Sequence, residues 1–308
     1  MKNFNEFVKE IQNNIKDYLP KDYQDAEISI EDFQKLNKTC TGIQTVRPGE
    51  DMGIVINLDY FCGMYLYSVC DLKEILQEIA DLVINSPTPE NLEWVTNYDK
   101  IKERLFIRVS SAETNKEIFK TAPHQLIEDL VITVHVAVLI DEDQCQSILV
   151  EDKLLEAYGI SKEQLFADAM SNSPKLLPSD VKTINAAIED TWPEKIITDD
   201  IIGNPPMYVV SNTQGINGAS VIFYPHFMEK MGSLLKSDFF LLPSSIHEMI
   251  LVPDDGIVNA DILYTLVQEV STNRVEMADR LTNNVYHYDR KENIFETADK
   301  FIKLQQKK

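Results

Sequence analysis

Apolar residues recur with the period of a helix in several parts of the chain. Over residues 4–19 they stand three and four positions apart, which predicts a first helix. A second helix is predicted after Asp71, because Asp71 and Glu74 have the spacing of a capping box ahead of an apolar stripe over residues 72–83. Later helices are predicted from capping residues ahead of apolar positions: after Ser161, from Ser179 to Trp192, and after Asn259.

Other segments have the composition or the alternation of strands. Residues 129–140 are dominated by β-branched side chains and predict a buried strand, with residues 147–150 returning as its partner. Alternating positions over residues 105–109 predict another strand. Residues 285–289 and 294–297 predict a hairpin across the charged turn between them.

Residues 207–256 carry the strongest hairpin signal. Asn217-Gly218 stands between two apolar runs, and a type I′ turn needs φ above zero at both central residues. We therefore expect strands over 207–211 and 219–224, joined by this turn. The elements predicted after it are a helix and two strands, over residues 226–235, 238–242 and 248–252.

A short internal echo connects this segment with an earlier one. Ser147 and Ser220 each open a β-branched or aromatic run, and Gly159 and Gly232 each follow a helical pattern, 73 residues apart in both cases. The echo predicts a strand–turn–strand–helix module that is used twice, with the glycine as a helix C-cap.

Together these elements predict an α+β fold, with mixed or antiparallel sheets and flanking helices. The expected organisation is an N-terminal helical segment, a first α+β module, a second α+β module with a closing helix and hairpin, and a solvated tail. These parts are expected over residues 1–45, 46–200, 201–300 and 301–308.

The charge of the chain restricts its partners. The sequence has 50 acidic and 29 basic residues, a net charge of −21, which repels phosphate backbones and anionic membrane surfaces. We therefore expect neither direct nucleic-acid binding nor membrane binding. An acidic surface is also what a decoy that imitates nucleic acid requires, so such a decoy is one functional alternative.

The cysteines and the ends of the chain indicate no cofactor and no export. Cys40, Cys62, Cys70 and Cys145 form no C-x-x-C pair, so neither a zinc motif nor a redox motif is predicted. We expect no metal and no cofactor. The first residues lack the apolar region of a signal peptide, and no run of about 18 apolar residues occurs. The expected location is the cytoplasm, with reduced thiols.

One cluster contains the side chains of nucleophilic catalysis. Ser244, Ser245, His247 and Glu248 follow one another closely, and Asp254-Asp255-Gly256 comes shortly after. However, neither a G-x-S-x-G elbow nor an H-E-x-x-H motif is present. The structural alternative is that the serines form a bend between two strands, where His247 and Glu248 satisfy backbone donors.

Two other histidines are interpreted differently from each other. His135 lies within an apolar run and is interpreted as a hydrogen-bonded sheet histidine rather than a ligand. His287 lies between Tyr286 and Tyr288 on a predicted strand; if that strand is exposed, an aromatic patch there forms an interaction surface. The alternative is that these aromatic residues reflect only the ordinary composition of strands.

Four segments in order resemble a domain-of-unknown-function family: NLDYFCGMYLYSV (57–69), APHQLIEDLVITVHV (122–136), SILVEDKLLEAYGISKEQLFADAMSNS (147–173) and FFLLPSSIHEMILVP (239–253). The resemblance extends from about residue 45 to residue 300, and its most specific part is the Leu-Pro-Ser-Ser-Ile-His-Glu run. It implies a cytoplasmic protein from anaerobic gut bacteria, with no assigned activity, ligand or catalytic residue.

The leading hypothesis is a non-catalytic cytoplasmic protein that binds another, unidentified protein, because a well-patterned globular chain carries no catalytic signature. The first alternative is a hydrolase that uses Ser244 or Ser245 with His247 and Glu248, which requires these side chains to converge in a cleft. The second alternative is the acidic decoy.

Overall fold

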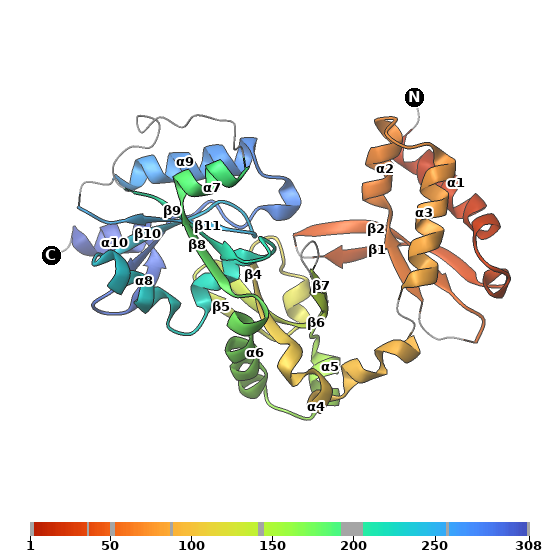
Figure 1. The fold of residues 1–308 in the computed structure, drawn as a ribbon, viewed down its shortest axis with the longest axis horizontal. Helices are drawn as coiled ribbons and strands as arrows, with labels where there is room; N and C mark the ends of the chain where they lie inside the picture. Colours follow the sequence, from red (N-terminus) through yellow and green to blue (C-terminus); the bar gives the residue numbers. More distant parts are fainter. Residues whose placement is uncertain are drawn as a thin grey trace. The chain divides into compact units, whose positions relative to one another are not determined.

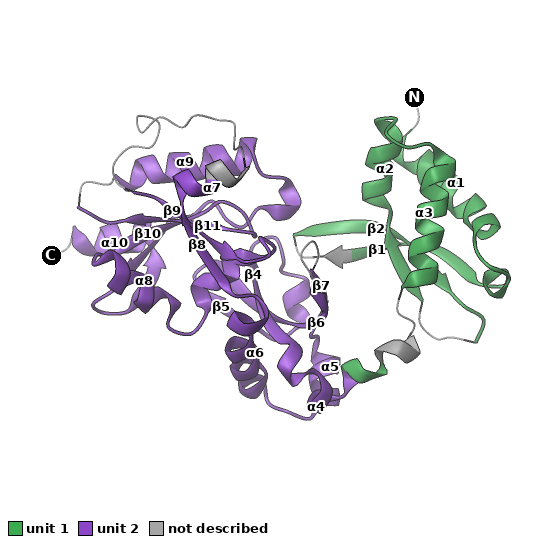
Figure 2. Ribbon diagram, viewed as in Figure 1, with its two compact units in different colours: residues 1–95 green, residues 96–308 purple. Residues whose placement is uncertain are grey.

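A computed structural model gives the fold of residues 3–35, 37–49, 53–86, 89–140, 145–191, 206–256 and 259–306. The chain divides into two compact units, residues 1–95 and residues 96–308, called unit 1 and unit 2 (Figure 2). Both units combine helices with antiparallel sheets, so the predicted α+β class is confirmed (Figure 1). The division differs from the expected organisation, since strand β2 (Lys38–Val46) crosses the expected boundary at residue 45.

Unit 1 consists of a three-stranded sheet and helices that share one core. Its elements are α1 (Phe4–Asn14), η1 (Ile15–Tyr18), η2 (Lys21–Tyr23), β1 (Glu27–Lys35), β2, β3 (Ile54–Asn57), α2 (Leu58–Leu66), α3 (Leu72–Asn85) and η3 (Pro89–Thr96), the η elements being 3₁₀ helices. The predicted capping box of α3 is confirmed, because Asp71 and Glu74 accept from each other's backbone N–H at 2.9 Å.

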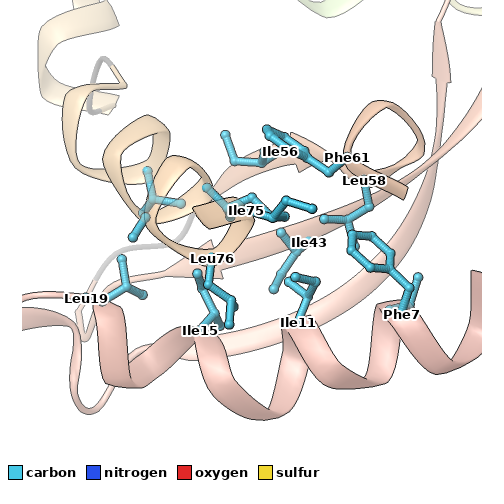
Figure 3. Packing of buried hydrophobic residues seen from close by; sticks show 14 of the residues in the cluster. Phe7, Ile11, Ile15, Leu19, Ile43, Ile56, Leu58, Phe61, Ile75 and Leu76 are labelled. Carbon is cyan, nitrogen blue, oxygen red and sulfur yellow. The ribbon is translucent and has the colours of Figure 1, made fainter. Parts of the chain in front are cut away.

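The core of unit 1 lies between the sheet and the helices (Figure 3). Phe7, Ile11 and Ile15 reach it from the first helical segment, Ile43 from β2 and Ile75 from α3, and all are fully buried. Burial of each such side chain stabilises the fold by about 1.5–3 kcal/mol. The helical spacing of Phe7, Ile11 and Ile15 in the sequence therefore reflects their common orientation toward the sheet.

The β1–β2 hairpin was not predicted. Its nine pairs run from Glu27 opposite Val46 to Lys35 opposite Lys38. Polar residues occupy most of the outward positions, and Asn37 adopts a left-handed conformation (φ 66°) at the turn. The first 45 residues are therefore not wholly helical, because the apolar positions of β1 are too few to give a strong pattern.

Unit 2 contains two sheets. In the smaller one the central strand β6 (Leu130–Ile140) pairs on one side with β4 (Leu105–Ser111) and on the other with β5 (His124–Ile127) and β7 (Cys145–Leu149). The predicted buried strand and its partner over 147–150 are confirmed. The other elements before the second sheet are α4 (Tyr98–Ile101), η4 (Lys102–Arg104), η5 (Ile118–Lys120), α5 (Asp152–Tyr158) and α6 (Lys162–Leu176).

The larger sheet has the strand order β13-β12-β10-β11-β9-β8. Its strands are β8 (Ser179–Thr183), β9 (Tyr208–Asn212), β10 (Phe239–Pro243), β11 (Met249–Pro253), β12 (Tyr286–Asp289) and β13 (Ile294–Thr297). The accompanying helices are α7 (Ile184–Thr191), η7 (Gly218–Phe223), α8 (Phe227–Leu235), α9 (Ala260–Asn273), η8 (Met277–Asp279) and α10 (Ala298–Gln305). Phe240 and Val252 of this sheet pack with Leu263 of α9 and Phe301 of α10.

The strand predicted over 219–224 is wrong, because this segment is the buried 3₁₀ helix η7. Asn217 is left-handed (φ 54°) as predicted, but the turn leads into a helix. Gly218 is required by close approach, since a Cβ there would lie 2.5 Å from the carbonyl oxygen of His247 and 2.7 Å from the backbone nitrogen of Asn212. Residues 218–223 therefore pack against β9 and β11 and do not pair with them as a strand.

Two further expectations are corrected. The helix predicted from Ser179 begins only at Ile184, because residues 179–183 pair with β9 as an edge strand; Trp192 lies outside the described residues. In the internal echo, Ser147 belongs to strand β7 whereas Ser220 belongs to η7. Gly159 is a left-handed C-cap (φ 65°), whereas Gly232 lies inside α8. The structural elements therefore do not repeat at this spacing.

A partly buried carboxylate joins the two sheets of unit 2. Asp129, in the turn between β5 and β6, accepts hydrogen bonds from the hydroxyl of Tyr286 (2.5 Å), the hydroxyl of Thr282 (2.6 Å) and the amide of Asn284 (2.9 Å). Hydrogen bonds to a charged acceptor are stronger than those between neutral groups.

Among the described residues, no helix has the length and apolarity needed to cross a membrane.

Candidate functional site

The predicted serine–histidine–glutamate cluster forms the connection between β10 and β11. The backbone N–H groups of Ser244 and Ser245 both donate to the carbonyl oxygen of Glu248 at 3.2 Å. The Ser244 hydroxyl donates to the Glu248 carboxylate at 2.7 Å. These bonds close the bend on itself, in the way expected of the structural alternative.

His247 is directed toward a different set of partners. Its Nδ1 accepts from the backbone N–H of Asn217 at 3.1 Å, and its carbonyl oxygen accepts from the Ser211 hydroxyl at 2.8 Å. Its Nε2 lies 3.5 Å from Asp279 of η8. The imidazole therefore accepts a hydrogen bond from the backbone N–H of Asn217, the left-handed residue ahead of η7. This hydrogen bond connects the bend with η7.

A serine nucleophile needs its hydroxyl within hydrogen-bond reach of a base. Within the described part of the chain, neither serine hydroxyl bonds to the imidazole: that of Ser244 bonds to Glu248, and that of Ser245 accepts from the backbone N–H of His247 at 3.0 Å. The side chains thus do not line up as nucleophile and base, because the imidazole bonds to Asn217 whereas the Glu248 carboxylate bonds to Ser244.

A cavity of about 380 Å³ borders Glu248. Its polar lining includes Asp180, Lys182, Ser211, Asn212, Gln214 and Glu248. Asp180 and Lys182 form an ion pair at 3.1 Å, and the Asn212 side chain donates to the carbonyl oxygen of Ile216 at 2.8 Å. Sequence reasoning missed Asp180 and Lys182 because their segment was predicted as a helix.

The second acidic group predicted beside the cluster makes a turn and supports a histidine. Asp254 accepts from the backbone N–H of Gly256 at 2.9 Å, and its other oxygen lies 3.3 Å from Nε2 of His287. The hydrogen bond from His287 holds the pKa of Asp254 below its ordinary value. In the described residues, no group of three or more His, Cys, Asp and Glu side chains is placed to hold a metal ion.

The interpretation of His135 is confirmed. This buried ring lies 3.1 Å from the Thr133 hydroxyl and 3.4 Å from that of Ser147. Burial, and secondly the Arg108 guanidinium, lowers its pKa well below the ordinary value, which keeps the ring neutral.

The aromatic surface predicted around His287 is wrong. Tyr286, His287 and Tyr288 are all buried, because β12 is an inner strand between β10 and β13. The ring of His287 also stacks on Phe301 of α10, with centroids 3.6 Å apart. The strand itself was predicted correctly. Its own sequence pattern gives no information about α10, the helix that covers it.

An exposed apolar surface lies instead along α2 and the residues that follow it in unit 1. It consists of Tyr60, Leu66, Tyr67 and Val69, which are 64%, 45%, 85% and 68% exposed, and is called the α2 patch below. Tyr60 and Tyr67 are seven residues apart and share one helix face. Between them, a Cβ added to Gly63 would meet no atom within 4 Å, so this face is open.

The backbone holds the α2 patch in a defined conformation. The N–H of Val69 bonds to the carbonyl oxygen of Met64 at 2.9 Å, and that of Ser68 bonds to Tyr65 at 3.2 Å. With Ser68 left-handed (φ 58°), these bonds form a Schellman motif. The motif turns Val69 back over the helix end. No element was predicted from the sequence over residues 59–67, so the sequence did not indicate this surface.

No curated protein and no solved structure matches the chain. The family of unknown function DUF5688 matches residues 4–290, most of the sequence. The chain therefore belongs to the DUF5688 family of unknown function.

Proposed function

We propose that this protein is a non-catalytic, cytoplasmic bacterial protein that binds another protein through the α2 patch. The observation that carries the proposal is the exposure of four large apolar side chains within ten residues of sequence. Contiguous exposed apolar surface is uncommon on monomeric proteins and marks interaction sites. Aromatic side chains, tyrosine among them, are enriched in such sites.

The distribution of the other exposed apolar residues supports this choice. In the described part of unit 2 each lies on a different element: Leu126, Leu139, Leu234, Ile262, Met277, Ile294 and Leu304. In unit 1 the others are Val55 on β3 and Leu82 and Ile84 on α3, each 37–42% exposed and so less exposed than any member of the patch. Single exposed apolar residues are ordinary and need no function. The α2 patch differs because its four members belong to α2 or to the three residues that follow it.

The patch is also suited to binding because it is fixed before a partner arrives. The Schellman motif orders the backbone of Ser68 and Val69, and Phe61 and Cys62 anchor α2 in the core. A backbone that is already ordered loses less conformational entropy on binding than a flexible loop would. Two exposed tyrosines on one anchored helix therefore provide binding groups at low entropic cost.

Affinity capture from the native host's lysate tests the proposal. The bait is the tagged full-length chain, either wild type or with Tyr67→Ser and Val69→Ser together. Ile262→Ser is the matched control, because Ile262 is 66% exposed and lies on α9 of unit 2. We expect wild type and control to retain the same stoichiometric partner, and the double variant to lose it. Equal retention by all three proteins, or by none, contradicts the proposal.

A further inference from the structure

Carboxylates border the α2 patch where the chain enters α3. Asp71 caps this helix, and Glu74 and Glu78 follow one and two turns along it, all three exposed. The pKa of the Cys70 thiol is raised above its ordinary value. The largest cause is desolvation, and the negative charges of Glu74, Glu78 and Asp71 follow. Because Cys70 directly follows Val69, these acidic side chains lie beside the apolar ones.

Few basic groups offset this charge. Asp71 and Glu74 use their carboxylates to cap backbone N–H groups and form no ion pair with a described residue. Glu78 forms no ion pair with any residue in the described part of the chain, and Lys73 is the one basic residue of the first turns of α3. Over residues 1–95 acidic residues outnumber basic ones by about two to one, so the potential around the patch is negative.

Resting on the proposed function, we infer that the α2 patch binds a basic amphipathic segment of a partner protein. Apolar side chains of that segment contact Tyr60, Tyr67 and Val69, while its lysines and arginines face Glu74 and Glu78. Complementary charge of this kind speeds association and rejects wrong partners. A recognition helix with an apolar face and basic flanks has this pattern.

The same acidic border disfavours the other possible occupants. A two-fold dimer through the patch would bring two copies of one small surface together, with both acidic borders across a single interface. Like charges placed opposite each other across an interface are unfavourable. An anionic membrane surface is disfavoured for the same reason.

Peptide titration of the full-length protein tests the inference. The probe is a fluorescent peptide that repeats Leu-Lys-Lys-Leu-Leu-Lys-Leu twice, and its control has Glu at each Lys position. Binding is followed by anisotropy at near-physiological salt, where a surface charge acts over about 8 Å. We expect the basic peptide to bind at least about tenfold more tightly than the acidic one, a difference of about 1.4 kcal/mol.

Substitutions locate the site. Tyr67→Ser with Val69→Ser should weaken the basic peptide at least about tenfold, as loss of central anchors does. Glu78→Gln should weaken it about two- to fivefold, the range of an exposed charge pair. Glu27→Gln, a matched change at the exposed start of β1 in the same unit, should leave it unchanged. Unchanged circular dichroism confirms that each variant folds.

Three results would overturn the inference. Equal, patch-dependent binding of both peptides means that the partner is apolar but not basic, which leaves the proposed function intact. Equal binding of the basic peptide by wild type and the Tyr67/Val69 variant means attraction by net charge alone, with no role for the patch. Patch-dependent dimerisation in sedimentation equilibrium identifies a second copy of the chain as the occupant.

Discussion

Replacing Gly218 by alanine tests whether the bend from Ser244 to Glu248 is a structural support. A Cβ at residue 218 would approach the Ser211 hydroxyl, the carbonyl oxygen of His247 (2.5 Å) and the backbone nitrogen of Asn212 (2.7 Å). Contacts of this length are much shorter than van der Waals distance. Two of the three atoms belong to backbone that is held by the sheet and by hydrogen bonds. The Ser211 side chain can move only by giving up its hydrogen bond to the carbonyl oxygen of His247.

The magnitude follows from the number of rigid contacts. Overpacking a well-packed site costs typically about 1–3 kcal/mol, and we expect Gly218→Ala to lie at the upper end, about 3 kcal/mol. For a unit of this size, about 3 kcal/mol lowers Tm by about 6–12 °C. The shift should affect the transition of unit 2, which contains η7 and the bend.

Calorimetry of Gly218→Ala and Gly63→Ala measures the effect against a matched control. Gly63 lies in α2, where an added Cβ meets nothing within 4 Å. Alanine there should stabilise unit 1 by about 0.4–1 kcal/mol, because it restricts the unfolded chain. If Gly218→Ala unfolds within about 0.5 kcal/mol of wild type, which is the range of neutral surface changes, then η7 does not pack tightly on the bend and the structural role assigned to His247 is refuted.

Three other predictions concern stability. Ser68→Gly should stabilise unit 1 by about 0.5–1 kcal/mol in urea unfolding, because glycine adopts the left-handed conformation without the cost that serine bears; a destabilised variant would argue against the Schellman motif. Asp129→Ala should cost about 3–5 kcal/mol, since it removes three hydrogen bonds to a carboxylate, and Tyr286→Phe should cost less because two remain; equal costs would contradict the network. The lowered pKa of Asp254 contributes stability above about pH 4 that is lost as the pH falls through the folded-state value. The stability difference between wild type and Asp254→Asn should therefore shrink between pH 7 and pH 3, and a constant difference would show that His287 does not stabilise the charged form.

Elements with local signals were predictable from the sequence. The capping box at Asp71 and Glu74 depends on residues three apart, and the β-branched run of β6 is fixed by its own composition. The hairpin of β12 and β13 is likewise formed by adjacent segments. In these cases propensity and tertiary structure agree, so the pattern alone is sufficient.

Elements that depend on distant neighbours were not predictable. Residues 219–224 have a strand composition, but the close approach of Asn212 and His247 to Gly218 directs the chain into η7. The polar edge strand β8 exists because it pairs with β9. Tertiary contacts override weak local preferences in both places.

The candidate site, too, was only partly predictable from the sequence. The sequence identified Ser244, Ser245, His247 and Glu248 as polar neighbours, but their partners come from β9, η7 and η8. Likewise, the apolar run of α2 is visible in the sequence. Which of its side chains are left exposed is decided by the packing of α1 and α3 in unit 1.

Hydrogen–deuterium exchange of the full-length protein, with and without the basic leucine–lysine peptide, tests the central claim most directly. The α2 patch as binding surface predicts slower exchange on peptide addition across residues 60–70, with the strongest effect at the backbone amides of Ser68 and Val69. Protection confined to the cavity beside Glu248, over residues 211–216 and 244–248, with residues 60–70 unchanged, would contradict the account.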